Sequence, residues 1–160
     1  MKSKLLIFVI LFSLCSSLKA QMVYLPDTAW RNFLMTQGLS TCIVGDSLDS
    51  SCPAILGITS LNCSSKYITD ISGIDYFTNL IDFNCSNNMI FSMPELPLGL
   101  LNLICLNNQL SNLDNLPPFL KSLNCAVNNL QTLDSLPSTL TFLACGENDL
   151  VSINSVFDSL

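Results

Sequence analysis

One short pattern of apolar residues recurs through most of the chain. The clearest copies are LLNLICLNNQLSNL at residues 100–113 and LKSLNCAVNNLQTL at residues 120–133, which align without a gap. Both read L-x-x-L-x-C-x-x-N-x-L-x-x-L, and residues 80–93 and 140–153 follow the same frame. An earlier unit begins at Ile58, runs two residues longer and carries Lys66 where the others have Asn. Self-similarity at a period of 20 residues predicts a solenoid of stacked turns.

The repeat frame assigns side chains to the inside or the outside of such a solenoid. In L-x-x-L-x-C the fourth and sixth positions alternate onto one face of a short strand, and successive strands would lie about 4.8 Å apart. We expect the Asn of each unit to turn inward, where its carboxamide satisfies backbone groups of neighbouring turns. These structural residues are Asn88, Asn108, Asn128 and Asn148.

The pattern resembles the leucine-rich repeat family. The Leu-Pro steps at residues 96–97, 116–117 and 136–137 resemble its short bacterial subclass. The resemblance implies a leucine-rich repeat solenoid with short parallel β-strands on a concave face. On the convex side, prolines in a 20-residue period favour extended, polyproline-like segments over helices.

Residues 21–57 lie outside the repeat frame and are predicted to form a small N-terminal helical cap. Asp27 suits a helix N-cap, and Trp30, Phe33 and Leu34 share one helix face, which Gly38 would end. We expect Trp30 and Phe33 to cover the first unit. Residues 23–27 and 68–80 resemble the cap and first repeat of secreted leucine-rich proteins from Bacteroidetes-type bacteria.

Residues 1–20 read as a secretory signal peptide. A basic MKSK start precedes ten apolar or small residues, too few to span a bilayer, and no second such stretch follows. Cleavage after Ala20 or after Ser17 fits, and lipid attachment at Cys15 is an alternative. We therefore expect a secreted or cell-surface bacterial protein without a transmembrane segment.

The repeats are assigned to residues 58–160. Leu160 stands where a sixth unit would start, so we expect a truncated array, with further repeats and a sorting or anchoring domain to follow.

Composition excludes several function classes. Twelve acidic residues stand against six basic ones, three of which lie in the signal, and this charge is hostile to nucleic acid and to anionic membranes. The chain has no histidine, so Ser-His and Cys-His nucleophiles and His-ligated metals are excluded. We expect no enzyme activity, no cofactor and no metal site.

The cysteines divide into two groups. Cys42 and Cys52 flank a polar loop in the cap, and we expect a disulfide between them in an oxidising compartment. Five others hold the sixth position of each unit and are predicted to be free, buried thiols: Cys63, Cys85, Cys105, Cys125 and Cys145. A metal-binding thiolate ladder is less favoured, because zinc needs four convergent ligands and this column is linear.

Acidic residues offer two weaker alternatives. Asp46 and Asp49 lack the spacing of a calcium loop. The carboxylates that a glycosidase would need do not recur as a pair at one repeat position; they are Asp82, Glu95, Asp114, Asp134 and Glu147.

The third, fifth and seventh positions of each unit should face outward from the strands. On this concave face the candidate ligand-binding residues are Asn84, Asn102, Ile104, Leu106, Asn124, Phe142 and Ala144. Exposed apolar side chains among small polar ones are typical of recognition surfaces. The sequence predicts a non-catalytic extracellular module that binds a protein or glycan. The alternative is the repeat region of a larger enzyme or effector, similar to bacterial ubiquitin ligases, whose catalytic domain is absent here.

Overall fold

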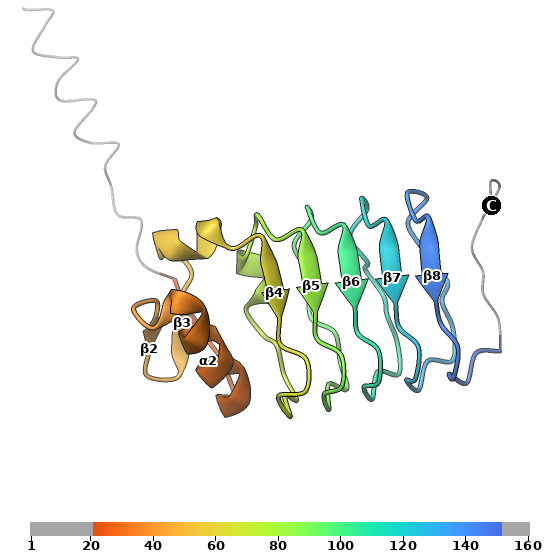
Figure 1. The fold of residues 1–160 in the computed structure, drawn as a ribbon, viewed down its shortest axis with the longest axis horizontal. Coiled ribbons are helices and arrows are strands. Elements are labelled where there is room, and N and C mark those ends of the chain that lie inside the picture. The colour runs from red at the N-terminus through yellow and green to blue at the C-terminus, as the bar shows by residue number, and fades with distance from the viewer. Residues whose placement is uncertain (1–20, 152–160) are drawn as a thin grey trace, which may run out of the picture.

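Five short parallel strands stand side by side along the molecule, with an N-terminal cap at one end (Figure 1). The computed structural model describes residues 21–151, so the predicted signal peptide and residues 152–160 lie outside the described part. The strands are β4 (Ser60–Asn62), β5 (Asp82–Asn84), β6 (Asn102–Ile104), β7 (Ser122–Asn124) and β8 (Phe142–Ala144). Each pairs in register with the next, which confirms the predicted solenoid.

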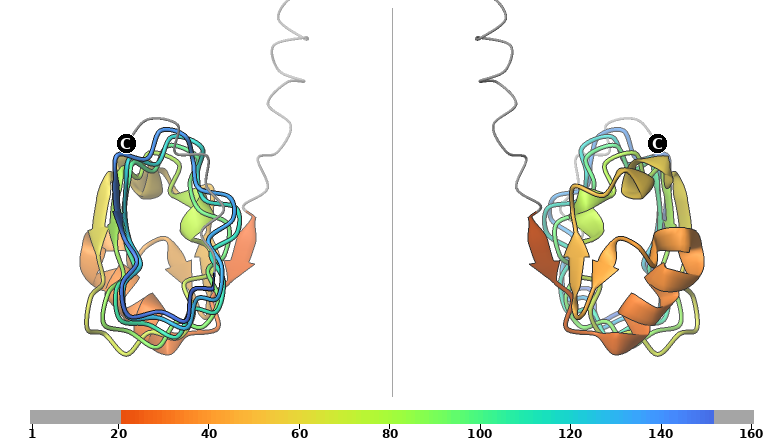
Figure 2. Two further views of the ribbon diagram at one scale, coloured as in Figure 1. Left: turned by 90° about the vertical axis from the view of Figure 1, so that its right-hand side faces the viewer. Right: turned by 90° about the vertical axis from the view of Figure 1, so that its left-hand side faces the viewer.

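The core lies inside the turns, which superpose when viewed along the array (Figure 2). Equivalent side chains stack on one another, and in the third unit Leu100, Leu103 and Cys105 are fully buried. In the last described unit Leu143 and Cys145 are only partly buried. The expectation of five buried thiols is therefore wrong for Cys145.

The return segments carry little regular structure. Among the described repeat residues the helical element is one short 3-10 turn, η3 (Ile74–Tyr76), in the longer first unit. The carbonyl groups of Pro97, Pro117 and Pro137 each accept a hydrogen bond from the N–H three residues later, at 3.0 to 3.1 Å. These prolines thus begin a tight turn that leads the chain back into the next strand.

The cap combines a helix with a small sheet that the sequence analysis missed. Helix α2 (Thr28–Leu34) continues into a π-helical turn, η1 (Met35–Leu39), in which Gly38 has a φ of 84°. Strands β1 (Met22–Tyr24), β2 (Ile43–Val44) and β3 (Ser47–Asp49) form an antiparallel sheet in the order β1-β3-β2. A second 3-10 segment, η2 (Pro53–Gly57), leads to β4.

Trp30 joins the cap to the repeats. Its side chain is fully buried, and its Nε1–H donates to the Ser72 carbonyl at 3.0 Å. The ring stacks on Phe33 with centroids 5.7 Å apart and lies 6.5 Å from the ring of Phe83 in β5. Trp30 and Phe33 therefore cover the first hydrophobic turn, as the sequence predicts, and the cap elements lie across that end of the array (Figure 2).

Asp27 makes a second connection between cap and repeats. One carboxylate oxygen accepts from the Trp30 N–H at 2.7 Å, which caps α2 as predicted. The other accepts from the backbone N–H and the hydroxyl of Thr69, at 2.7 and 2.6 Å. Burial would raise the pKa of Asp27, but these hydrogen bonds outweigh it and hold the pKa below its ordinary value.

A left-handed residue follows two positions after every cysteine of the array. Ser65, Asn87, Asn107, Val127 and Glu147 have φ values between 54° and 57°. Asn tolerates this conformation, whereas a β-branched side chain is disfavoured because its Cβ crowds the backbone. Val127 is therefore the strained member of the column.

Replacing Val127 with Asn should raise the free energy of unfolding by about 1 kcal/mol, because the left-handed conformation is easier for Asn. Urea unfolding of both proteins measures the difference. Asn107→Val is the matched reverse change in the preceding unit and should lower the stability by a similar amount. An unchanged or lower stability of the Val127→Asn protein would contradict the strain.

Asp27→Asn should lower the free energy of unfolding by about 1 kcal/mol near neutral pH. The amide NH2 group of Asn would face the N–H and hydroxyl of Thr69, which are donors themselves. The carboxylate has a lowered pKa in the folded protein, so its contribution is present above about pH 4 and is lost as the pH falls through the folded value. The stability gap between wild type and variant should therefore close in acid. Unfolding curves at several pH values test this, with Asp114→Asn as an exposed control. A gap that does not change with pH would contradict it.

Candidate binding face

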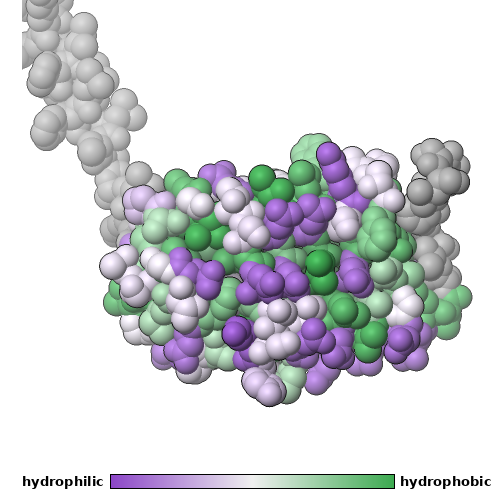
Figure 3. All heavy atoms as spheres, viewed as in Figure 1, coloured by the Kyte–Doolittle hydropathy of each residue, from purple (hydrophilic) through white to green (hydrophobic). Residues whose placement is uncertain are grey.

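The side chains of β4 to β8 that point away from the core form one continuous surface, here called the strand face (Figure 3). The middle residue of each strand points inward, and its two neighbours point outward. Register pairing sets Asn84, Ile104, Asn124 and Ala144 in one row across four strands. Asn102 and Phe142 lie in the parallel row two positions earlier, and Leu106 two positions later. Six of the seven candidate binding residues thus lie on this face, and Leu106 follows β6 in the adjoining turn.

Hydrogen bonds fix the orientation of the carboxamides on the strand face. The Asn84 Oδ1 accepts from the N–H and the hydroxyl of Ser86 at 3.0 and 2.7 Å, and Asn124 Oδ1 accepts from the Ala126 N–H at 3.3 Å. Within residues 21–151 the Nδ2 groups of Asn84 and Asn124 have no acceptor, so both are available to a ligand. Ser86 was expected to face outward but is only 5% exposed, because this bond folds it against the turn.

The strand face changes in polarity along the array. Near the cap, Asp82 accepts a 2.6 Å hydrogen bond from Asn102, so the two side chains form a polar pair across β5 and β6. Farther along, Ile104, Leu106 and Ala144 are partly exposed. The Phe142 ring on β8 is 54% exposed. The distal part of the face therefore offers apolar contacts and the proximal part hydrogen bonds.

The inward Asn residues hold successive units together and offer nothing to a ligand. The Nδ2 group of Asn108 donates to the Cys85 and Cys105 carbonyls at 3.1 and 3.0 Å, and its Oδ1 accepts from the Ile90 N–H at 3.0 Å. Asn88, Asn128 and Asn148 repeat this pattern. Each carboxamide thus satisfies backbone groups of two adjacent turns.

The cysteine column, formed by the sixth residue of each unit, lies behind the strand face, and its buried thiols are unreactive. Burial raises the pKa of the Cys63 and Cys125 thiols to about 12, and it raises those of Cys85 and Cys105 as well. Neighbouring thiols of the column raise the pKa of Cys85 further. These thiols are therefore protonated at neutral pH and are poor nucleophiles and poor metal ligands.

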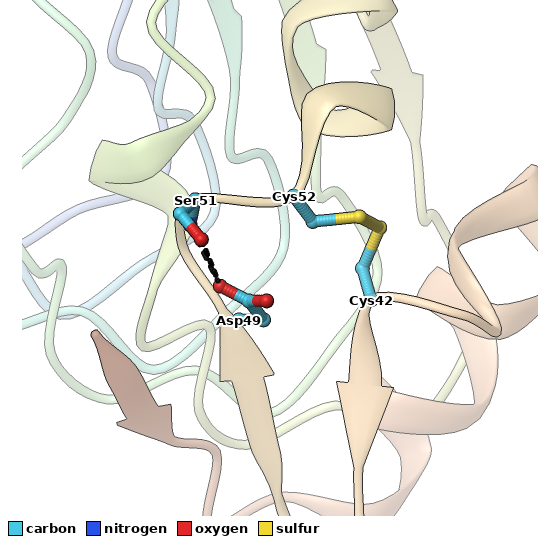
Figure 4. Close-up of a disulfide and its surroundings, with 4 residues drawn as sticks. All are labelled: Cys42, Asp49, Ser51 and Cys52. Carbon is cyan, nitrogen blue, oxygen red and sulfur yellow. Dashed lines mark hydrogen bonds between the residues drawn. A yellow bond between two sulfur atoms is a disulfide. The ribbon is translucent and has the colours of Figure 1, made fainter. Parts of the chain in front are cut away.

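The predicted Cys42–Cys52 disulfide is confirmed (Figure 4). It joins Cα atoms 5.5 Å apart and closes the loop that contains β2 and β3. In the same loop the Asp49 Oδ1 accepts hydrogen bonds from the N–H and hydroxyl of Ser51 at 2.9 and 2.6 Å. This carboxylate is therefore engaged by the turn itself.

A cavity that the sequence analysis missed lies where the cap meets the first repeat. It has a volume of about 320 Å³ and is lined by Ala29, Asn32, Phe33, Thr36 and Lys66. Lys66 occupies the position that holds the inward Asn in the other units. In the sequence, Lys66 in place of Asn was one sign that this unit differs. The cavity itself is formed only by the packing of α2 against the first unit.

Residues 21–151 contain no cluster of three or more Cys, Asp and Glu side chains placed to hold a metal ion. Within the same residues, none of the helices has the length and apolar character needed to cross a membrane.

Solved structures resemble this arrangement. The functional domain of InlJ from Listeria monocytogenes, which includes a cysteine ladder, matches with a TM-score of 0.68 and 29% identity over 84% of this chain and 31% of that one. The fold is that of a leucine-rich repeat protein. A Shigella effector leucine-rich repeat domain matches with a TM-score of 0.63 and 25% identity over 81% of this chain and 58% of that one.

YopM from Yersinia enterocolitica also matches, with a TM-score of 0.50 and 34% identity over 52% of this chain. The chain covers 18% of YopM, and it covers less than two thirds of each of the three solved chains. No protein-family model and no curated protein sequence matches this chain.

Thiol labelling should separate the two groups of cysteines. We expect iodoacetamide to modify Cys145 first in the native protein, because it alone of the five free thiols is partly exposed, and to modify the other four only in denaturant. Mass spectrometry of the alkylated protein counts the adducts, and the disulfide-bonded Cys42 and Cys52 provide the unlabelled control. A single adduct in denaturant would mean that the column cross-links in pairs.

Proposed function

We propose that this leucine-rich repeat chain is a non-catalytic, extracellular recognition module that binds a protein or glycan through its strand face. The observation that carries the proposal is the apolar part of that face: the Phe142 ring on β8 is 54% exposed on the same strand as the partly exposed Ala144, and Ile104 is partly exposed on β6, with β7 between them. None of these side chains is needed for the hydrophobic core. Exposed aromatic and aliphatic groups within a polar surface are what binding interfaces use as anchors.

The extracellular setting is supported by the cap disulfide, since such bonds persist in oxidising compartments. The signal-like residues 1–20 and the bacterial proteins of similar fold point the same way. We propose a bacterial surface protein of the Bacteroidetes type on the resemblance of the cap and first repeat.

A non-catalytic role is supported by the state of the polar groups. The chain has no histidine. Four of the five column thiols are held protonated by burial. Asp82, the carboxylate on the strand face, is hydrogen-bonded to Asn102 and has no second carboxylate beside it in the row of outward residues. On the strand face this arrangement provides neither a nucleophile nor an acid and base couple.

A second candidate function is the repeat region of a larger effector. The observation that favours it is coverage, because the chain spans 18% of YopM and 58% of the Shigella effector domain. In that case the strand face would select a partner for activity located in another domain.

The native protein is cross-linked to a partner on bacterial or host surface material. Replacing both Ile104 and Phe142 with Ser should abolish the binding of that partner. Thermal unfolding should change little, because both side chains lie outside the core. Mass spectrometry identifies the cross-linked partner, and Phe119→Ser removes a ring of similar exposure, 60%, from a position outside the strand face. Equal capture by the double variant would move the site to another face.

A further inference from the structure

Two apolar residues keep a backbone conformation that does not suit them. Val127 has a φ of 57° and Tyr67 a φ of 59°, and both conformations are unfavourable for a side chain with a bulky Cβ substituent. Asn occupies the position equivalent to Val127 in the two preceding units, where Asn87 and Asn107 are joined by a 3.0 Å side-chain hydrogen bond. Retained strain of this kind is a reason to look for a function.

Core packing does not account for either side chain. Tyr67 is 79% exposed, the most exposed aromatic residue among residues 21–151, and Val127 is partly exposed. Both lie on the edge of the solenoid formed by the four residues after each cysteine, here called the turn edge. This edge consists of residues 64–67, 86–89, 106–109, 126–129 and 146–149.

Other exposed or partly exposed apolar residues occur on the turn edge in the same or the adjacent unit. Met89, one turn after Tyr67 in the repeat frame, is 39% exposed. Val127 directly follows Ala126, whose carbonyl is bonded by the Asn107 N–H, and Ala126 and Leu106 are both partly exposed. Leu106 continues the row of outward side chains from Ile104 on the strand face. The apolar part of that face therefore extends over the turn edge.

Charge gives the turn edge a direction. Lys66 stands beside Tyr67 at the cap end, next to the 320 Å³ cavity that it lines with Asn32 and Thr36. Glu147 and Asp149 stand at the other end and are exposed. A ligand with charge of one sign would be repelled at one end, so the complementary ligand carries a negative group at one end and a positive group at the other.

We propose that the turn edge and the distal strand face form one groove-free docking surface for an extended protein segment. Its apolar side chains contact Tyr67 and Val127, a carboxylate faces Lys66, and a basic residue faces Glu147 and Asp149. Three turns separate the two anchors, about 14 Å at the usual spacing of parallel strands, which about four residues of extended chain span. This assignment rests on the proposed function and adds the class and orientation of the partner.

A library of random dodecapeptides displayed on phage, selected on the purified protein, provides the probe. We expect enriched peptides to combine two apolar residues about four positions apart with an acidic end and a basic end. Synthetic copies are then measured by fluorescence anisotropy. Tyr67→Asn and Val127→Asn should each weaken binding at least tenfold while raising the melting temperature, since both relieve strain. A binding loss therefore cannot come from unfolding. Phe119→Asn is the matched control and should bind as wild type.

Three outcomes would overturn the inference: no enriched peptide, peptides without the charge order, or binding to both Asn variants within twofold of wild type. The double variant Ile104→Ser, Phe142→Ser distinguishes binding at the turn edge from the more general proposal of binding at the strand face. Loss of peptide binding in that protein alone would keep the strand face as the site and exclude the turn edge. Normal peptide binding in all of these variants would place the peptide site on neither surface.

Discussion

The structure depends on the hydrogen bonds of the buried Asn carboxamides between successive turns. Where the chain winds around the core of a solenoid, each turn buries polar backbone groups between its neighbours, and each unpaired group would cost about 1 to 3 kcal/mol. Asn128 meets this need by donating to the Cys105 and Cys125 carbonyls and accepting from the Leu110 N–H. Since one side chain serves two turns, each unit is stable only against its neighbour.

The first unit has no preceding repeat, and the cap takes over that role by different chemistry. Lys66 stands at the position of the inward Asn, and its backbone N–H is bonded by Asn88 of the next unit. On the other side, Trp30 covers the apolar turn and donates to Ser72, and Asp27 fixes Thr69. Lys therefore replaces Asn in the unit where the cap, and not another repeat, packs against the array. The cavity beside Lys66 exists because a helix, rather than another flat turn, packs there.

The repeat pattern constrains the inward side chains and leaves the outward ones free to vary. Inward positions must be apolar or Asn, while the strand face and the outward residues of the turn edge vary from unit to unit. Asn84, Ile104, Asn124 and Ala144 share a row, yet differ in polarity. A repeated scaffold thus lets the outward surface differ from unit to unit without altering the core.

The sequence by itself determined the solenoid, the strand positions, the inward Asn residues, the helix N-cap at Asp27 and the cap disulfide, because each follows from a local pattern or from the period. Tertiary structure decided what depends on distant contacts. Strand β1 pairs with β3 across 23 to 27 positions of sequence, and its three residues are too few to leave a pattern. The cavity at Lys66 needs α2 placed against the first unit. The left-handed backbone at Val127 is imposed by the stacked turns on both sides, against the preference of the residue itself, so its own side chain gave no sign of it.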